Sequence, residues 1–183
     1  MRAAPGPCCW SADLGVLAMA DGITEFALQF RLNGADIACR VPVQQTLADL
    51  LRDQLGLKGT KIGCSRGVCG ACVALVDGEP VATCSTFSFQ AHGCDVVSIE
   101  GLARDGALHA IQQAFIAHSA FQCGYCTAGM VLLAKALLDR HADPDRATII
   151  EWLSSNVCRC TGYAQIIEAV EDAARRLRAE AAS

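Results

Sequence analysis

The chain has 183 residues, a net charge of −4, and 52% hydrophobic residues, but only 5% aromatic ones. This length allows one or two domains with a real core, built here mainly from aliphatic side chains and alanine. Charges of both signs are spread along the chain, which argues against a nucleic-acid partner, because such proteins carry a basic face. No apolar run reaches the ~18 residues that a membrane span needs.

The 12 cysteines favour metal sites over disulfides. Their fraction lies below the ~8–10% typical of disulfide scaffolds, and a chain of this size does not depend on cross-links. Half of them lie in tight C-x2-C and C-x-C pairs, which favour metal ligation. Iron–sulfur clusters are normally inserted in the reducing cytosol, which suits free thiols, so we expect a cytoplasmic protein.

Residues 1–21 lack any periodic pattern. The short apolar run over 14–20 ends like a signal-peptide cleavage site, but Arg2 is the only positive residue before it, so a secretory signal is not favoured. We interpret residues 1–21 as a disordered extension, or as a stretch upstream of the true translation start, with Met19 as the alternative first residue.

Residues 22–101 read as a small α+β domain. Apolar and polar residues alternate over 25–32, the signature of a half-buried strand. Asn33-Gly34 is a tight-turn signal and predicts an antiparallel return strand. Thr46 can cap a helix that Gly56 ends. The predicted elements are strands over 25–32 and from 37 to 41, a helix over 47–55, a hairpin of 73–76 and 81–83 with Pro80 at its edge, and a strand over 96–99.

Residues 106–183 change to a helical period, so the domain boundary falls near 101–106. The stretch 129–140 is apolar almost all round and is expected to be the central helix. Asp143-Pro144 breaks the chain after it. Four helices are predicted: one that includes Leu108, Ile111 and Phe115, one over 129–140, one over 149–153, and a C-terminal one with the stripe Ile166, Val170, Ala173 and Leu177.

The first cysteine set lies in a glycine-rich loop. Cys64, Cys69 and Cys72 follow C-x4-C-x2-C, with Cys84 downstream, the spacing that holds a plant-type 2Fe–2S cluster. Glycines let the backbone wrap closely, so that its N–H groups can offset the negative charge of the sulfurs. The alternative is structural zinc, which usually takes two C-x2–4-C pairs and fits this spacing less well.

The second set combines C-x2-C with C-x-C. Cys123 and Cys126 precede the predicted central helix, and Cys158 and Cys160 precede the last one. The positive end of a helix favours thiolate and an anionic cluster. On spacing alone, a second 2Fe–2S cluster competes with zinc and with unliganded core thiols.

Other polar residues are given no metal role. Cys39 alternates with apolar neighbours and is interpreted as a small core residue, whereas Cys94 lies in a polar loop. The histidines lack the pairing that a Rieske centre needs. Arg159 is either a solvated charge or a charge that tempers the cluster between its ligands.

Four stretches resemble one known family. They are the cysteine loop over 63–72, Gln122-Cys-Gly-Tyr-Cys-Thr, Gly129-Met130, and Asn156-Val-Cys-Arg-Cys-Thr-Gly-Tyr163. Together they resemble the iron–sulfur subunit of the molybdenum hydroxylases, the xanthine dehydrogenase and carbon monoxide dehydrogenase family. The resemblance covers about residues 23–175. One departure is Ala128, where the family commonly has proline, and it leaves the cluster cysteines untouched.

The resemblance implies an α+β protein: an N-terminal ferredoxin-like β-grasp domain followed by a four-helix domain, each with one 2Fe–2S cluster. It implies a large molybdopterin subunit, approached by Gln122 and Cys160, and a medium-sized FAD subunit facing the N-terminal cluster. Electrons would pass from molybdenum through both clusters to FAD or another acceptor, and no residue of this chain is expected to be catalytic. The alternatives are a free-standing two-cluster ferredoxin and a zinc-held interaction module. The implied ligands are Cys64, Cys69, Cys72, Cys84, Cys123, Cys126, Cys158 and Cys160.

Overall fold

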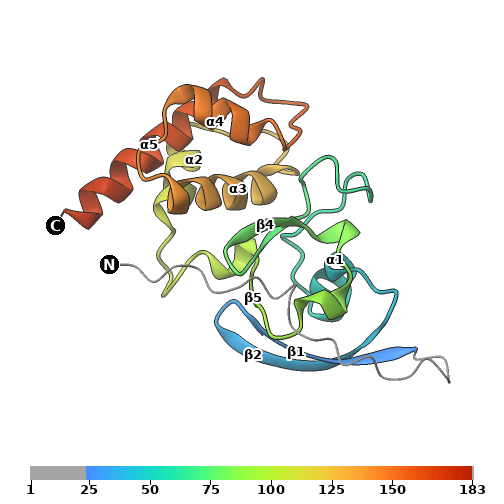
Figure 1. The fold of residues 1–183 in the computed structure, drawn as a ribbon. Coiled ribbons are helices and arrows are strands. Elements are labelled where there is room, and N and C mark those ends of the chain that lie inside the picture. The colour runs from blue at the N-terminus through green and yellow to red at the C-terminus, as the bar shows by residue number, and fades with distance from the viewer. Residues whose placement is uncertain (1–23, 183) are drawn as a thin grey trace.

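The computed structural model describes residues 24–182, so the extension expected over 1–21 lies outside the described residues. A five-stranded mixed sheet comes first in the chain, and a helical domain follows and packs against it (Figure 1). The strand order is β2-β1-β5-β3-β4. The strands are β1 Glu25–Leu32, β2 Ala35–Pro42, β3 Val73–Val76, β4 Glu79–Ala82 and β5 Asp95–Val97.

The predicted strands are confirmed, with small changes at their ends. β1 pairs with β2 antiparallel and with β5 parallel, and β3 lies antiparallel to both β5 and β4. Pro80 lies on the edge strand β4, where its missing N–H does no harm. Thr83 and Ile99, predicted as strand residues, instead begin 3₁₀ turns. These turns occur at Thr83–Ser85, Ser88–Ala91 and Ile99–Gly101.

The helix predicted over 47–55 forms, but its geometry changes partway. Thr46 caps it as expected, since its Oγ1 accepts the backbone N–H of Asp49 at 3.1 Å. Only α1, Leu47–Asp49, is α-helical, and a π-helix continues over Leu50–Gln54. Its wider turn shows in the Leu55 N–H, which donates to the carbonyl of Leu50 at 2.9 Å.

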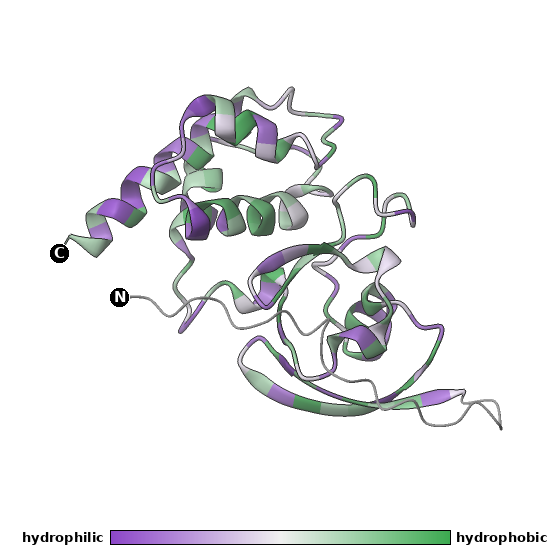
Figure 2. Ribbon diagram, viewed as in Figure 1, coloured by the Kyte–Doolittle hydropathy of each residue, from purple (hydrophilic) through white to green (hydrophobic). Residues whose placement is uncertain are grey.

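The helical domain is arranged around α3, whose colour in Figure 2 is hydrophobic along most of its length. Leu108 lies before α2 and is 41% exposed, so its predicted place on the buried face is wrong. The physical reason is a cap: Nδ1 of His109 accepts the N–H of Ile111, and the helix starts after it. The helices are α2 Ala110–Ala117, α3 Thr127–Arg140, α4 Arg146–Leu153 and α5 Ala164–Ala181.

Strand β3 contributes side chains to the hydrophobic cores of both domains. Successive side chains of a strand point to opposite faces. Val73 and Leu75 accordingly belong to the core of the helical domain, whereas Ala74 and Val76 belong to the core under the sheet. The two domains therefore share a continuous apolar boundary.

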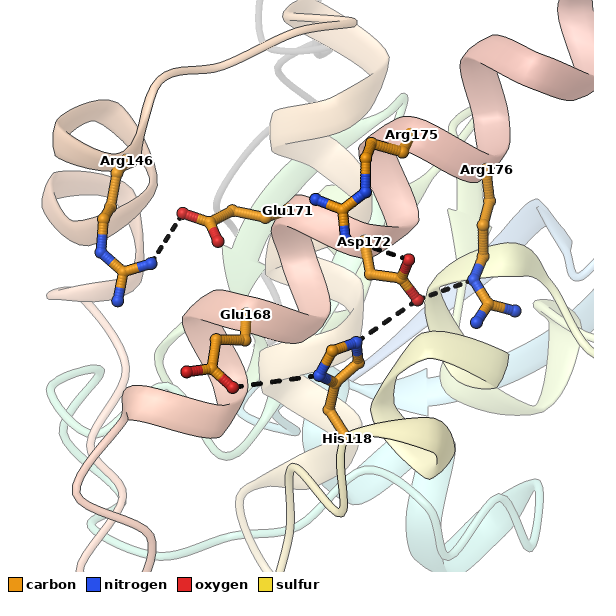
Figure 3. Close-up of polar contacts among 7 residues, drawn as sticks. All are labelled: His118, Arg146, Glu168, Glu171, Asp172, Arg175 and Arg176. Carbon is orange, nitrogen blue, oxygen red and sulfur yellow. Dashed lines mark hydrogen bonds and ion pairs between the residues drawn. The ribbon is translucent and has the colours of Figure 1, made fainter.

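Polar side chains join α5 to the end of α2 and the start of α4 (Figure 3). His118, which caps the end of α2, lies 3.4 Å from Asp172 and 4.0 Å from Glu168. Arg146, the first residue of α4, pairs with Glu171 at 2.7 Å. These contacts fix the C-terminal helix, whose N-terminus follows the last cysteine pair.

Candidate metal centres

The eight predicted ligand cysteines come together as four pairs, two pairs at each site. The thiols of Cys160 and Cys123 are hydrogen-bonded. Cys69 also acts on the pKa of Cys64, Cys84 on that of Cys72, and Cys158 on that of Cys126, so these thiols are neighbours. The sulfurs of Cys123 and Cys160 are 3.6 Å apart. Two sulfurs on one tetrahedral metal would be about 3.8 Å apart at a metal–sulfur distance of about 2.3 Å.

This pairing fits a binuclear cluster. In a 2Fe–2S cluster held by four cysteines, each iron takes two protein sulfurs, whereas a single zinc draws all four to one point. Within residues 24–182, no group of three or more His, Cys, Asp or Glu side chains is arranged to hold a metal ion. Each predicted set has the four thiols that one 2Fe–2S cluster requires.

The first site surrounds the sulfur of Cys64 with backbone donors. The N–H groups of Cys69, Arg66 and Val68 each donate to Cys64 Sγ at 3.4 Å. These hydrogen bonds lower the pKa of the Cys64 thiol to about 6, that of Cys69 contributing most. The loop thus stabilises negative charge on sulfur before any metal contributes.

Backbone conformation makes this loop possible. Ser65 and Gly67 both have positive φ, 53° and 70°. The N–H of Gly67 points at Cys84 Sγ, 3.3 Å away. The positive φ of Gly67 favours glycine, and a Cβ there would lie 2.6 Å from the hydroxyl of Ser85. On the other side of the site, burial raises the pKa of the Cys72 thiol to about 11.

The second site uses side chains as well as backbone. Cys126 is the N-cap of α3, and burial raises the pKa of its thiol to about 12. Burial would also raise the pKa of Cys158, but hydrogen bonds from Thr161 bring it below its ordinary value. The donors are the Thr161 hydroxyl at 3.1 Å and its N–H at 3.5 Å.

The two cysteine loops touch each other. The N–H of Val157 donates to the carbonyl of Cys69 at 2.9 Å. The side chain of Asn156, 1% exposed, fills the space beside Gly70, where a Cβ would lie 1.4 Å from its Oδ1. Gly129 of α3 faces the carbonyl of Gly70, and a Cβ there would approach that oxygen to 2.2 Å. The loop that carries Cys158 and Cys160 therefore packs directly against the loop that carries Cys69 and Cys72.

A buried donor lies at this contact. Among the described residues, Nδ2 of Asn156 has no hydrogen-bond acceptor. A buried unpaired donor is costly, and the sulfurs of an anionic cluster are acceptors of the kind that would satisfy it. This orphaned group beside Gly70 is consistent with cluster binding by the neighbouring loops.

The second site opens at the surface. Gln122, Cys123 and Cys160 are exposed, whereas Cys72 of the first site is 1% exposed. Arg159, between two ligand candidates, is exposed as well.

The structure also places the cysteines that were given no metal role. Cys39 packs at the edge of the sheet core, as predicted. Cys94 lies in the loop before β5, as predicted, but it is 1% exposed and belongs to that core; its thiol lies 3.7 Å from the carbonyl of Gln90.

Sequence reasoning gave no role to Thr161, Tyr163 or Asn156. Each lies within a few residues of Cys158, and a hydroxyl or amide that close to a ligand could have marked a hydrogen-bond partner. Spacing alone does not show which of them turn back toward the sulfur.

Two family models match consecutive parts of the chain. Residues 30–93 match a 2Fe-2S iron-sulfur cluster binding domain, and residues 98–171 match a [2Fe-2S] binding domain. The fold and the matches define a class: iron–sulfur electron-transfer proteins with a β-grasp-like domain followed by a helical domain, each of which binds 2Fe–2S.

Similar proteins of known name place the chain more closely within this class. The chain is 44% identical to the 6-hydroxypseudooxynicotine dehydrogenase complex subunit beta of Paenarthrobacter nicotinovorans, over 81% of this chain and 93% of that protein. It is 43% identical to the nicotinate dehydrogenase small FeS subunit of Eubacterium barkeri, over 84% and 98%. In the crystal structure of quinoline 2-oxidoreductase from Pseudomonas putida 86, a chain of 42% identity superposes with a TM-score of 0.82, over 86% and 98%.

The chain belongs to the small 2Fe–2S subunits of the molybdenum hydroxylases. It is an electron-transfer subunit of a multi-subunit oxidoreductase, which sets aside the free-standing ferredoxin and the zinc-held module. None of the helices described over residues 24–182 has the length and apolarity to span a bilayer.

Proposed function

We propose that the two cysteine sites hold the two 2Fe–2S clusters through eight thiolates. The observation that carries this assignment is the arrangement of the sulfurs in pairs, two pairs per site. When bound, each cluster accepts and releases one electron at a time, while the protein sets its position and potential. The ligands are Cys64, Cys69, Cys72 and Cys84 in a domain of residues 22–101, and Cys123, Cys126, Cys158 and Cys160 in a domain of residues 106–183.

In this proposal the second site faces the molybdopterin of a large partner subunit. Its support is the exposed edge formed by Gln122, Cys123 and Cys160. Gln122 and Cys160 would approach the pterin by hydrogen bonding. The first site passes electrons on to FAD, held by a medium-sized subunit. The contact between Val157 and Cys69 keeps the relay short, which favours transfer because tunnelling decays steeply with distance.

The whole assembly is proposed to be cytoplasmic and to hydroxylate an aromatic heterocycle or an aldehyde. Relatives named for nicotinate and quinoline support the heterocycle. The substrate pocket lies on the large subunit, so this chain contributes electron transfer to any such substrate and performs no bond-breaking step.

Metal analysis tests the ligand assignment. The purified chain should contain about four irons and about four acid-labile sulfides, and the reduced protein should show two distinct paramagnetic resonance signals. Cys158→Ala should lose the second signal and about half of the iron and retain the first signal. Zinc without labile sulfide, or iron for a single cluster in the unaltered chain, would contradict the assignment.

Gln122→Ala tests the orientation toward the pterin. Both clusters should remain, because no ligand is lost, while cluster reduction by substrate in the complex with the large subunit slows or pterin occupancy falls. A buried pterin group left unpaired costs about 1–3 kcal/mol. Gln29→Ala, which removes an exposed glutamine on β1, is the matched control and should behave as the unaltered chain. Unchanged reduction and pterin occupancy in Gln122→Ala would place the docking face elsewhere.

A further inference from the structure

The turn after Cys160 folds back toward the sulfur of Cys158. The hydroxyl of Thr161 lies 3.1 Å from Cys158 Sγ. On its other side, the same oxygen accepts the backbone N–H of Tyr163 at 3.3 Å. The N–H uses a lone pair of the hydroxyl oxygen and leaves the hydroxyl proton to be donated to the sulfur.

Tyr163 holds this turn closed. Its hydroxyl accepts the N–H of Cys158 at 2.8 Å and donates to the carbonyl of Asn156 at 2.9 Å. Its own backbone is left-handed, with φ of 70°, a conformation that a non-glycine residue keeps only where its surroundings determine it. The ring therefore ties the two ends of the segment 156–163 together, and the tie presents the Thr161 hydroxyl to Cys158.

We propose that the Thr161 hydroxyl raises the reduction potential of the second cluster by donating a hydrogen bond to the Cys158 sulfur, with Tyr163 as the residue that positions it. This inference rests on the assignment of Cys158 as a cluster ligand. One-electron reduction adds a negative charge that is shared with the ligand sulfurs, so a donor to sulfur stabilises the reduced form more than the oxidised form. A second cluster with a higher potential is a better acceptor for electrons that arrive from a partner.

The first site offers a natural comparison. The three donors to Cys64 are backbone N–H groups, which a side-chain substitution does not remove. Thr161 is a side chain, so the potential of the second cluster can be changed by one residue while the first cluster serves as an internal reference.

The test is a redox titration of the purified two-cluster chain, followed by paramagnetic resonance, for Thr161→Val and Thr161→Ser. In Thr161→Val, the ratio of reduced to oxidised second cluster at a fixed potential should fall about tenfold, which is 59 mV for a one-electron couple. Thr161→Ser keeps the hydroxyl and should stay near the unaltered value. Tyr163→Phe should shift the second cluster in the same direction but less. The first cluster should not move in any variant.

Several outcomes would overturn the proposal. One is an unchanged reduction potential of the second cluster in Thr161→Val. Another is an equal shift in Thr161→Val and Thr161→Ser, because the effect would then come from packing and not from the hydroxyl. Loss of the second cluster in both Thr161→Val and Thr161→Ala, with Thr161→Ser intact, would make the residue structural. A missing second signal in the unaltered chain is a different failure, since it would refute the ligand assignment itself.

Discussion

Both cysteine sites surround a cysteine sulfur with hydrogen-bond donors, but the donors come from different kinds of groups. In the sheet domain, a loop with left-handed residues turns three backbone N–H groups toward Cys64. In the helical domain, the sulfur of Cys158 receives a hydroxyl and an N–H from Thr161, braced by Tyr163. The first arrangement depends on backbone conformation and so on glycine, whereas the second depends on particular side chains. Substitutions should therefore damage the first site through conformation and adjust the second through chemistry.

The largest effect should come from removing a ligand at each site in turn. Cys72→Ala and Cys160→Ala should each lose one cluster and about half of the iron, measured by iron analysis and paramagnetic resonance. Because Cys72 is buried and Cys160 is exposed, only the first should also destabilise the metal-free chain, by about 1 kcal/mol in denaturant unfolding. Loss of both clusters from either variant would show that the sites do not form independently.

The next effect concerns the contact that joins the sites. Gly70→Ala and Gly78→Ala share the strain of a left-handed φ, 71° and 84°, which costs about 1–2 kcal/mol. At Gly70, the new Cβ also collides with Asn156, whereas nothing lies within 4 Å of a Cβ at Gly78. Overpacking should add about 1–3 kcal/mol for Gly70→Ala alone, measured by denaturant unfolding of the metal-free chain. Equal destabilisation of the two variants would mean that Asn156 moves aside freely.

A smaller effect is expected from Tyr125, which ties the second cysteine motif to the first domain. Its hydroxyl donates to the carbonyl of Ile62 at 2.7 Å, and its side chain is 47% exposed. Tyr125→Phe should therefore cost about 0.5–1 kcal/mol and leave both clusters in place. Val68→Ala, on an exposed side chain of the first loop, is the control and should change stability by less than about 0.5 kcal/mol. A cluster lost in Tyr125→Phe would contradict a purely bracing role.

The smallest effect should appear in acid and should be confined to the helical domain. Burial would raise the pKa of Asp172, but Arg176 at 2.8 Å, with Arg175 and His118 nearby, holds it below its ordinary value (Figure 3). A carboxylate with a lowered folded pKa stabilises the fold above its unfolded pKa of about 3.9, and this stability is lost as the pH falls through the folded pKa.

The corresponding variant is Asp172→Asn, compared with Asp36→Asn on the exposed face of β2. The metal-free chain carrying Asp172→Asn should be less stable than the unaltered chain near pH 7, and the difference should shrink below about pH 4. Denaturant unfolding followed by circular dichroism at several pH values measures it. A constant difference across this range would show that the charge of Asp172 does not contribute.

The sequence alone predicted much of this molecule, wherever the information is local. Alternation over β1, the turn signal at Asn33-Gly34 and the all-round apolar face of α3 each arise from neighbours within one element. The C-x4-C-x2-C, C-x2-C and C-x-C spacings are equally local, whereas Cys126 and Cys158 of the second set lie far apart in the chain, and their grouping relied on the family resemblance. The Thr46 cap could also be predicted, since its hydroxyl oxygen accepts a hydrogen bond from a backbone N–H only three positions away.

Tertiary structure decided what depends on residues far apart in the chain. Spacing did not show that β3 divides two cores, that Cys94 is buried, or that Asn156 fills the space left by Gly70. It did not show the turn of Thr161 toward Cys158 either, although these residues are close in sequence, because a ring at Tyr163 determines the direction of that turn. Periodicity reports which side of an element is apolar, but which partner covers that side, and which donor meets which sulfur, is determined only when the domains pack.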